Sequence, residues 1–98
     1  VNPALVRDQA TGGTLFGLSA TMYEAVTVAD GHIDQSTLNT YRLMRMSEAP
    51  AIEVHLITSD AAPTGVGEIA TAPIGAAVCN ALFAATGRRV RTLPLVPA

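Results

Sequence analysis

The sequence contains no tryptophan and no lysine, so its six basic residues are all arginines. Aromatic residues make up 4% of the chain, and the net charge at pH 7 is −2. Nucleic-acid-binding domains usually carry a basic face with aromatic side chains among the charges. The single arginine cluster, Arg88, Arg89 and Arg91, follows a predicted helix, where positive charge complements the helix dipole. We therefore expect no nucleic-acid partner.

Cysteine is almost absent, and Cys79 alone can form neither an internal disulfide nor a cysteine-based metal site. Its neighbours are Ala, Val and Leu at helical spacing, which is typical of a small core residue. The two histidines, His32 and His55, are expected to face solvent, and neither has a partner at metal-ligand spacing. We expect no metal bound by protein side chains.

Charge is scarce: 14% of the residues are charged and 49% are hydrophobic, whereas an average soluble domain carries about 25% charged residues. A chain of 98 residues forms one domain at most. Because a domain this small buries only roughly 60–65% of its unfolded surface, it cannot hide so much apolar area. An oligomer, a membrane protein and a piece of a larger protein would each explain the excess. We favour the last.

Residues 69–87 form a run of nineteen residues without a charge, long enough to test as a membrane span. Pro73, Gly75 and Asn80 interrupt the run, and much of the remainder is alanine. This composition favours a helix buried within protein, so we expect no membrane span.

Two helices are predicted, at 3–21 and 73–86. Asn2 is a good N-cap, and Pro3 fits the first helical position, where its missing N–H costs nothing. Pro73 offers the second helix the same start, and Gly87 ends it.

Three glycines, Gly12, Gly13 and Gly17, lie inside the first predicted helix. In an exposed helix each costs about 1 kcal/mol relative to alanine. Their clustering predicts that something packs very close to one face of this helix. A neighbouring helix or strand, or a cofactor and its loop, would each meet that requirement.

The remaining segments favour strands. Asp30-Gly31 is a strong two-residue hairpin turn. A third strand is expected at 37–42, a half-buried strand at 51–57, where Ile, Val and Leu alternate with polar residues, and a short edge strand at 90–95.

The order of elements predicts an α+β fold, with two helices packed on one face of a small antiparallel or mixed sheet. No internal repeat or low-complexity linker divides the sequence. Residues 1–98 are therefore predicted to form a single domain or fragment.

A Gly-Val-Gly turn, Gly65, Val66 and Gly67, precedes the lone carboxylate of Glu68. Glycines let a backbone approach a ligand without a Cβ clash. A carboxylate just before a helix N-terminus is favoured by the helix dipole, and in a water-poor pocket it could act as a general base. On local chemistry alone, the interpretation that Glu68 merely caps the helix is favoured over a catalytic role. Phosphate binding by this loop is a further idea, although the loop lacks the Lys-Ser/Thr ending of a P-loop.

Three stretches together carry a family resemblance: "NPALVRDQATGGTLFGLSATMYE", "TYRLMRMSEAPAIEVHLI" and "GVGEIATAPIGAAVCNALFAATGRRVRTLPL". In order and spacing they resemble the C-terminal end of the molybdenum-binding large subunit of the xanthine oxidase family, in particular the isoquinoline 1-oxidoreductase β-subunit type. The resemblance extends over almost the whole chain. In that family the glutamate of the Val-Gly-Glu loop is the catalytic base, and Glu68 stands at that position.

The resemblance also implies which residues lie near the cofactor. Besides Gly65, Val66 and Gly67 of the loop, the matching positions are Gln9, Gly12 and Gly13. Phe16 is a departure, because many family members have glutamine at that position. A polar contact to the cofactor from this point is therefore not expected.

The function implied is hydroxylation of N-heteroaromatic compounds or aldehydes, with water as the oxygen donor. The implied cofactor is molybdopterin, in a bacterial enzyme as the cytosine dinucleotide form. Iron–sulfur clusters need cysteine ligands that this chain lacks, so they are expected on a small partner subunit. The other partners implied are the remainder of the large subunit and a small-molecule substrate. The compartment stays open between bacterial cytoplasm and periplasm.

Alone, the 98-residue chain is expected to bind no molybdenum cofactor, to be inactive, and to self-associate. A different class of function also stays open. The chain could be a freestanding α+β binding or assembly module whose exposed apolar face docks a partner.

Overall fold

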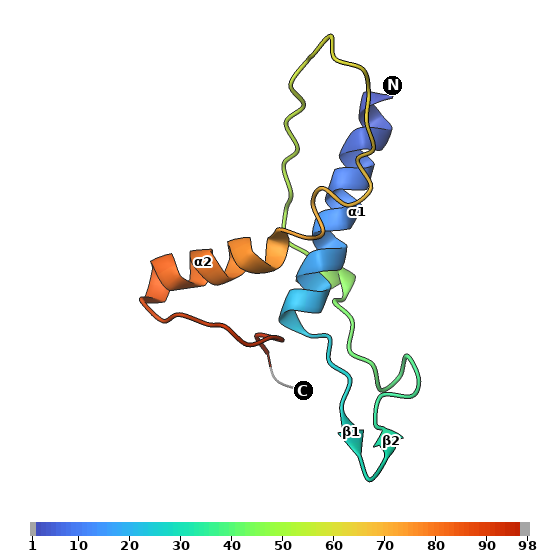
Figure 1. Ribbon diagram of the computed structural model, residues 1–98, viewed down its shortest axis with the longest axis vertical. Coiled ribbons are helices and arrows are strands. Elements are labelled where there is room, and N and C mark those ends of the chain that lie inside the picture. The colour runs from blue at the N-terminus through green and yellow to red at the C-terminus, as the bar shows by residue number, and fades with distance from the viewer. Residues whose placement is uncertain (1, 97–98) are drawn as a thin grey trace.

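The computed structural model describes residues 2–96 and contains two helices and one small hairpin (Figure 1). Helix α1 spans Pro3–Met22 and helix α2 spans Ile74–Thr86, with a short 3-10 helix at Met46–Glu48 between them. Strand β1, Val28–Ala29, pairs antiparallel with strand β2, His32–Ile33. The predicted α+β class is confirmed.

Both helices begin and end within one residue of the predicted positions. The Asn2 side-chain oxygen accepts hydrogen bonds from the N–H of Ala4 at 2.9 Å and of Leu5 at 3.4 Å. These bonds satisfy two of the backbone donors that a helix start leaves unpaired. Gly87 ends α2 in the left-handed conformation, with φ of 70°, and its N–H donates to the Phe83 carbonyl at 2.8 Å.

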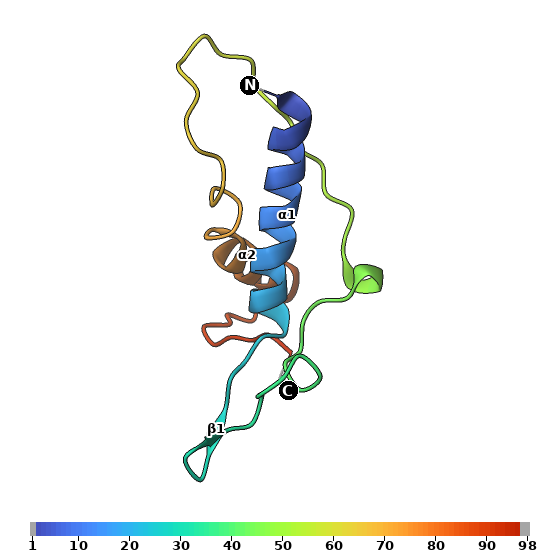
Figure 2. The same cartoon turned by 90° about the vertical axis from the view of Figure 1, so that its right-hand side faces the viewer.

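The predicted hairpin turn at Asp30 and Gly31 is confirmed, with φ values of 49° and 76°. Positive φ at both central residues matches the twist of the flanking strands. The hairpin projects beyond the C-terminal end of α1 (Figures 1 and 2). The two helices were expected to pack on this sheet, but they do not. They pack on each other, because two strands of two residues offer no face for a helix.

Three further strands were predicted wrongly. At 37–42 the chain turns instead, since the N–H groups of Thr40 and Tyr41 donate to the Thr37 carbonyl at 3.0 and 2.8 Å. At 51–57 no backbone hydrogen bond reaches another described residue. A strand exists only with a neighbour to pair with, and alternation of side chains does not supply one.

The third wrong strand, at 90–95, is replaced by a contact with the end of α1. The N–H of Leu95 donates to the Thr21 carbonyl and that of Val96 to the Met22 carbonyl, both at 2.9 Å. Carbonyls in the last turn of a helix have no partner within the helix. They therefore compete successfully for the donors of the C-terminal segment.

The described chain passes over the N-terminal end of α1, with residues 49–57 along one side of the helix and 64–73 along the other (Figure 2). The segment that leads into the first of these runs is attached near the far end of α1. There the Met44 N–H donates to Ser19 Oγ at 3.0 Å, and the Tyr41 hydroxyl donates to Glu24 Oε2 at 2.7 Å. The bond to the Glu24 carboxylate raises the pKa of the Tyr41 hydroxyl above its ordinary value.

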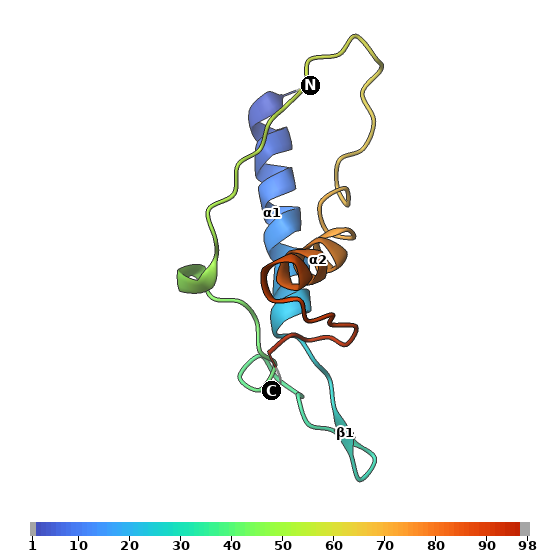
Figure 3. The same cartoon turned by 90° about the vertical axis from the view of Figure 1, so that its left-hand side faces the viewer.

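Helix α2 begins beside α1 and runs away from it (Figures 1 and 3). The point of closest approach is Gly17, which has no side chain. A Cβ atom on Gly17 would lie 2.4 Å from Ile74 Cγ2 and 2.5 Å from the Thr71 carbonyl oxygen. The close approach predicted from the glycines is therefore made by another part of the chain at Gly17, and also at Gly13, where a Cβ would lie 3.1 Å from Thr71 Oγ1. Gly12 differs, because nothing lies within 4 Å of its Cβ position.

Apolar side chains stay largely exposed. None of the hydrophobic residues among 2–96 is buried, and the molecule is elongated, with extents of 55 × 35 × 25 Å. Met46 is 90% exposed and Ile57 is 93% exposed. Neither helix in the described part of the chain combines the length and apolar character of a membrane span.

The glycine contact gives a direct test of the packing. Gly17→Ala should lower the free energy of unfolding by about 1–3 kcal/mol, because the methyl group would overlap atoms of Ile74 and Thr71. Gly12→Ala is the matched control and should raise it by up to about 1 kcal/mol through helix propensity. Denaturant unfolding followed by circular dichroism measures both. Equal stabilities for the two variants would contradict the close approach at Gly17.

The exposed apolar side chains predict self-association of the 98-residue chain. Sedimentation velocity at micromolar concentration should show dimers or larger species, because association removes apolar surface from water. Molybdenum analysis of the same sample should find none. A monomer would argue against the apolar-surface interpretation, and stoichiometric molybdenum would show that these residues suffice for the cofactor.

Candidate functional site

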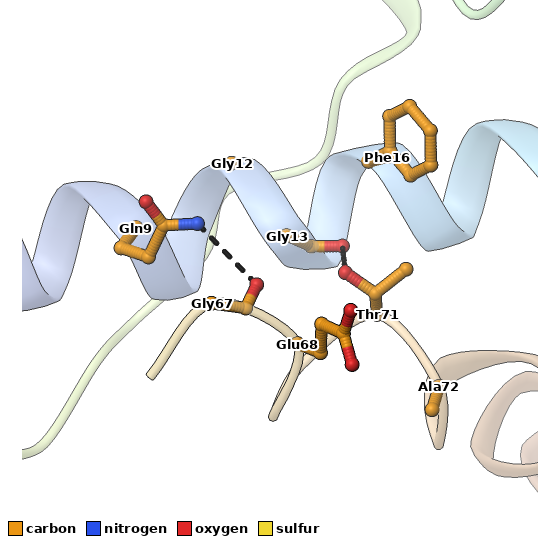
Figure 4. A pocket seen from close by; sticks show the side chains of 8 residues that line it. All are labelled: Gln9, Gly12, Gly13, Phe16, Gly67, Glu68, Thr71 and Ala72. Atoms are coloured by element: carbon orange, nitrogen blue, oxygen red, sulfur yellow. Dashed lines mark hydrogen bonds between the residues drawn. The ribbon is translucent and has the colours of Figure 1, made fainter. Parts of the chain in front are cut away.

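The loop that carries Glu68 is held against the middle of α1 by two hydrogen bonds (Figure 4). Gln9 Nε2 donates to the Gly67 carbonyl oxygen at 3.3 Å. Thr71 Oγ1 donates to the Gly13 carbonyl oxygen at 3.1 Å. One bond lies before Glu68 in the sequence and the other after it. The loop is thus attached to the helix on both sides of the carboxylate.

A tight turn connects Glu68 to the second of these attachments. The Thr71 N–H donates to the Glu68 carbonyl oxygen at 3.2 Å. Thr71 itself is half-buried, and its carbonyl faces Gly17 of α1. On this side of the carboxylate, Thr71 therefore links the backbone of Glu68 directly to the helix.

The loop and α1 border a cavity of about 500 Å³ that is open to solvent. Its walls combine residues of the first helix with residues more than fifty positions later in the sequence. They are Gln9, Gly12, Gly13, Phe16, Gly67, Glu68, Thr71 and Ala72. Five residues singled out from the sequence, Gln9, Gly12, Gly13, Gly67 and Glu68, thus lie around one cavity.

The other two loop residues lie outside this cavity. Val66 lines a second hollow, of about 670 Å³, together with Arg7 and Leu56. Gly65 belongs to neither lining, and nothing lies within 4 Å of its Cβ position. In this structure the two residues lead into the site rather than line it.

Glu68 does not cap α2. The helix begins at Ile74, its N-cap is Pro73, and no side chain hydrogen-bonds to its first turn. Turn residues 69–73 separate the glycine loop from the helix. The suggestion that Glu68 is a helix cap is therefore wrong, and so is the placement of the loop at a helix N-terminus on which phosphate binding depended.

The residues around the cavity suit a polar ligand that approaches backbone closely. Nothing lies within 4 Å of the Cβ positions of Gly12 and Gly67, so both backbones are open to a neighbour. Gln9 uses one amide hydrogen on Gly67 and keeps a second hydrogen and its carbonyl oxygen. Glu68 is exposed and adds a carboxylate acceptor. These hydrogen-bond donors and acceptors suit the polar edge of a pterin cofactor.

No metal cluster of side chains accompanies this cavity. Within residues 2–96, no three His, Cys, Asp or Glu side chains are grouped closely enough to hold a metal ion. His55 lies elsewhere, with its ring 86% exposed and its Nε2 3.5 Å from a Glu53 carboxylate oxygen. His32 is exposed on the hairpin, as predicted.

Thr71 is the site residue that the sequence did not reveal. Two signals pointed to it. It follows Glu68 by three positions, the spacing of a hydrogen-bonded turn. Gly13 and Gly17 are four positions apart and so share one face of α1, which marks where a backbone could dock.

Comparison with known proteins gives one family match. The family model described as the molybdopterin cofactor-binding domain matches residues 1–50. This region contains α1, with Gln9, Gly12 and Gly13, and ends after the short 3-10 helix.

Three relatives match nearly the whole chain. It is 41% identical over 96 residues to the isoquinoline 1-oxidoreductase subunit beta of Brevundimonas diminuta, covering 98% of this chain and 12% of the relative. It is 35% identical over 98 residues to a membrane-bound aldehyde dehydrogenase of Gluconacetobacter polyoxogenes, whose name includes pyrroloquinoline-quinone. This match covers 100% of this chain and 13% of the relative. It is 31% identical over 103 residues to the aldehyde oxidoreductase molybdenum-binding subunit of Escherichia coli K12. This match covers 97% of this chain and 14% of the relative. The chain spans about one eighth of the length of these curated relatives.

Proposed function

Because the chain belongs to the molybdopterin cofactor-binding domain family, as its resemblance to xanthine oxidase-type subunits predicted, we propose that it forms part of a molybdenum-dependent oxidoreductase. In this proposal Glu68 is the general base for hydroxylation of an N-heteroaromatic compound or an aldehyde, with water as the oxygen donor. The names of the relatives support these two substrate classes.

The observation that carries the proposal is the position of Glu68. Its carboxylate serves no helix cap and borders the same cavity as Gln9, Gly12 and Gly13. A general base must be fixed within hydrogen-bond reach of the proton it takes. The attachments at Gly67 and Thr71 support this role, because they hold the backbone from which the carboxylate projects.

When bound, molybdopterin supplies the metal that activates water and takes up the electrons of the reaction. Glu68 would take up a proton at its carboxylate oxygens, which border the cavity that the cofactor would occupy. The remaining amide groups of Gln9 would bind polar atoms of the cofactor, and Gly12 and Gly67 would let it lie close to the backbone. Gly13 borders the same cavity, and its missing side chain makes room for Thr71. Gly65 and Val66 lead into the loop that presents these groups. The cytosine dinucleotide form of the cofactor is part of the proposal.

Most of the enzyme lies outside these residues. The rest of the large subunit closes the cavity and covers the exposed apolar side chains, of which Met46 and Ile57 are the most exposed. Iron–sulfur clusters reside on a small partner subunit, since Cys79 is the only cysteine here. The 98-residue chain alone is inactive in this proposal, because one carboxylate without metal and closed walls is not an active site.

The central test replaces Glu68 in the full-length subunit. Glu68→Gln should lower turnover by about 10²–10⁴-fold, the usual contribution of general acid–base catalysis, since the amide keeps the shape but cannot accept the proton. Molybdenum and pterin content per subunit should stay close to the unmodified value. Steady-state kinetics with an N-heteroaromatic compound and an aldehyde, together with metal analysis, measure both.

Glu53→Gln is the matched control, because this carboxylate is 88% exposed and lies away from the cavity. It should leave turnover unchanged. Equal turnover for Glu68→Gln and Glu53→Gln would remove Glu68 from the base role. A subunit that contains pyrroloquinoline quinone and no molybdenum would overturn the cofactor assignment.

A further inference from the structure

We propose that Thr71 is a positioning residue for Glu68, through a side-chain hydroxyl that locks the Glu68–Thr71 turn onto the glycine face of α1. This inference rests on the proposed role of Glu68 as the base. Thr71 acts on the reaction through the position of Glu68 and does not itself contact the reacting atoms.

Thr71 makes contacts in two directions. Toward the loop, its N–H donates to the Glu68 carbonyl oxygen at 3.2 Å and so fixes the backbone from which the carboxylate projects. Toward the helix, its Oγ1 donates to the Gly13 carbonyl oxygen at 3.1 Å. Without the hydroxyl, the turn would keep its internal bond but lose this hydrogen bond to α1.

The fit of the hydroxyl depends on the missing side chain at position 13. A Cβ on Gly13 would lie 3.1 Å from Thr71 Oγ1 and 3.5 Å from the Ala70 Cβ. The Thr71 hydroxyl and the Ala70 methyl thus occupy the place that a side chain at position 13 would fill. A β-branched residue also has few χ1 rotamers, so little entropy is lost when the hydroxyl is aimed at the carbonyl.

The attachment from Gln9 to Gly67 is weaker than that of Thr71 in both bond length and burial. The bond from Gln9 to Gly67 is 3.3 Å long, and both residues are exposed, so water competes for the same groups. Thr71 and Gly13 are at least half-buried, which protects their bond from that competition. Thr71 therefore sets the position of the carboxylate more firmly than Gln9 does.

The test uses two variants of the full-length subunit. Thr71→Val removes the hydroxyl and keeps the branched shape, whereas Thr71→Ser keeps the hydroxyl. Thr71→Val should lower kcat by about 10–100-fold, the cost of a misplaced catalytic group, with KM and molybdenum content nearly unchanged. Thr71→Ser should stay within about threefold of the unmodified enzyme, as expected when the hydrogen bond is retained.

A readout without turnover comes from hydrogen exchange in the molybdenum-free subunit. A peptide covering 67–73 should exchange about tenfold faster in Thr71→Val than in Thr71→Ser, because the loss of about 1.4 kcal/mol of local stability changes the opening equilibrium by that factor. Peptides from the β1–β2 hairpin should exchange equally in both variants, which identifies the effect as local.

Four results separate the possible roles. Normal kcat and normal exchange in Thr71→Val, with Glu68→Gln inactive, would overturn the positioning role and leave the base assignment intact. Loss of molybdenum or of thermal stability at unchanged kcat per molybdenum would make Thr71 merely structural and overturn it as well. Full activity in Glu68→Gln would overturn the proposed function itself. Slow turnover with fast exchange in Thr71→Val, both restored in Thr71→Ser, supports the inference.

Discussion

The approach of residues 68–74 to the backbone of α1 is the constraint on which the candidate site depends. It is possible because Gly13 and Gly17 leave one face of the helix without side chains, where the Thr71 carbonyl and Ile74 come within 2.5 Å of the Cβ position of Gly17. An alanine at that position would push the turn away from the helix. Both attachments of the Glu68 loop would then lengthen, and the cavity between loop and helix would lose its shape.

The site shows how a chain with little buried apolar surface can still hold a few groups in fixed positions relative to one another. None of the hydrophobic residues among 2–96 is fully buried, although several in α1 and α2 are half-buried, so burial of apolar surface within this chain is only partial. The order near Glu68 comes instead from backbone proximity and from hydrogen bonds that use glycine carbonyls as acceptors. Such contacts are short-ranged and directional, which suits the placement of a carboxylate better than the support of a whole fold.

The sequence predicted what local chemistry decides. Asn2 and Pro3 begin α1, Gly87 ends α2, and Asp30-Gly31 turns the hairpin, because each of these signals acts within a few residues. The strands at 51–57 and 90–95 failed for the opposite reason. A strand needs a partner, and the partner is either absent from these residues or, for 90–95, replaced by the carbonyls at the end of α1.

The candidate site was predicted in part. The resemblance brought Glu68 together with Gln9, Gly12 and Gly13, and the structure places all four around one cavity. Gly65 and Val66 lie outside it, since adjacency in sequence does not fix which way a loop residue faces. Thr71 was missed, because its spacing from Glu68 and the glycine face of α1 indicate a turn and a docking surface, but they do not indicate the hydrogen bond from Thr71 to Gly13.

The two attachments of the loop each join residues 58 positions apart, and this separation has a consequence during synthesis. A ribosome adds roughly 5–20 residues per second, so several seconds pass between the appearance of Gly13 and that of Thr71. Helix formation takes on the order of a microsecond. Because an isolated helix is only marginally stable in water, α1 can form and unfold many times in this interval, each time with its glycine face open.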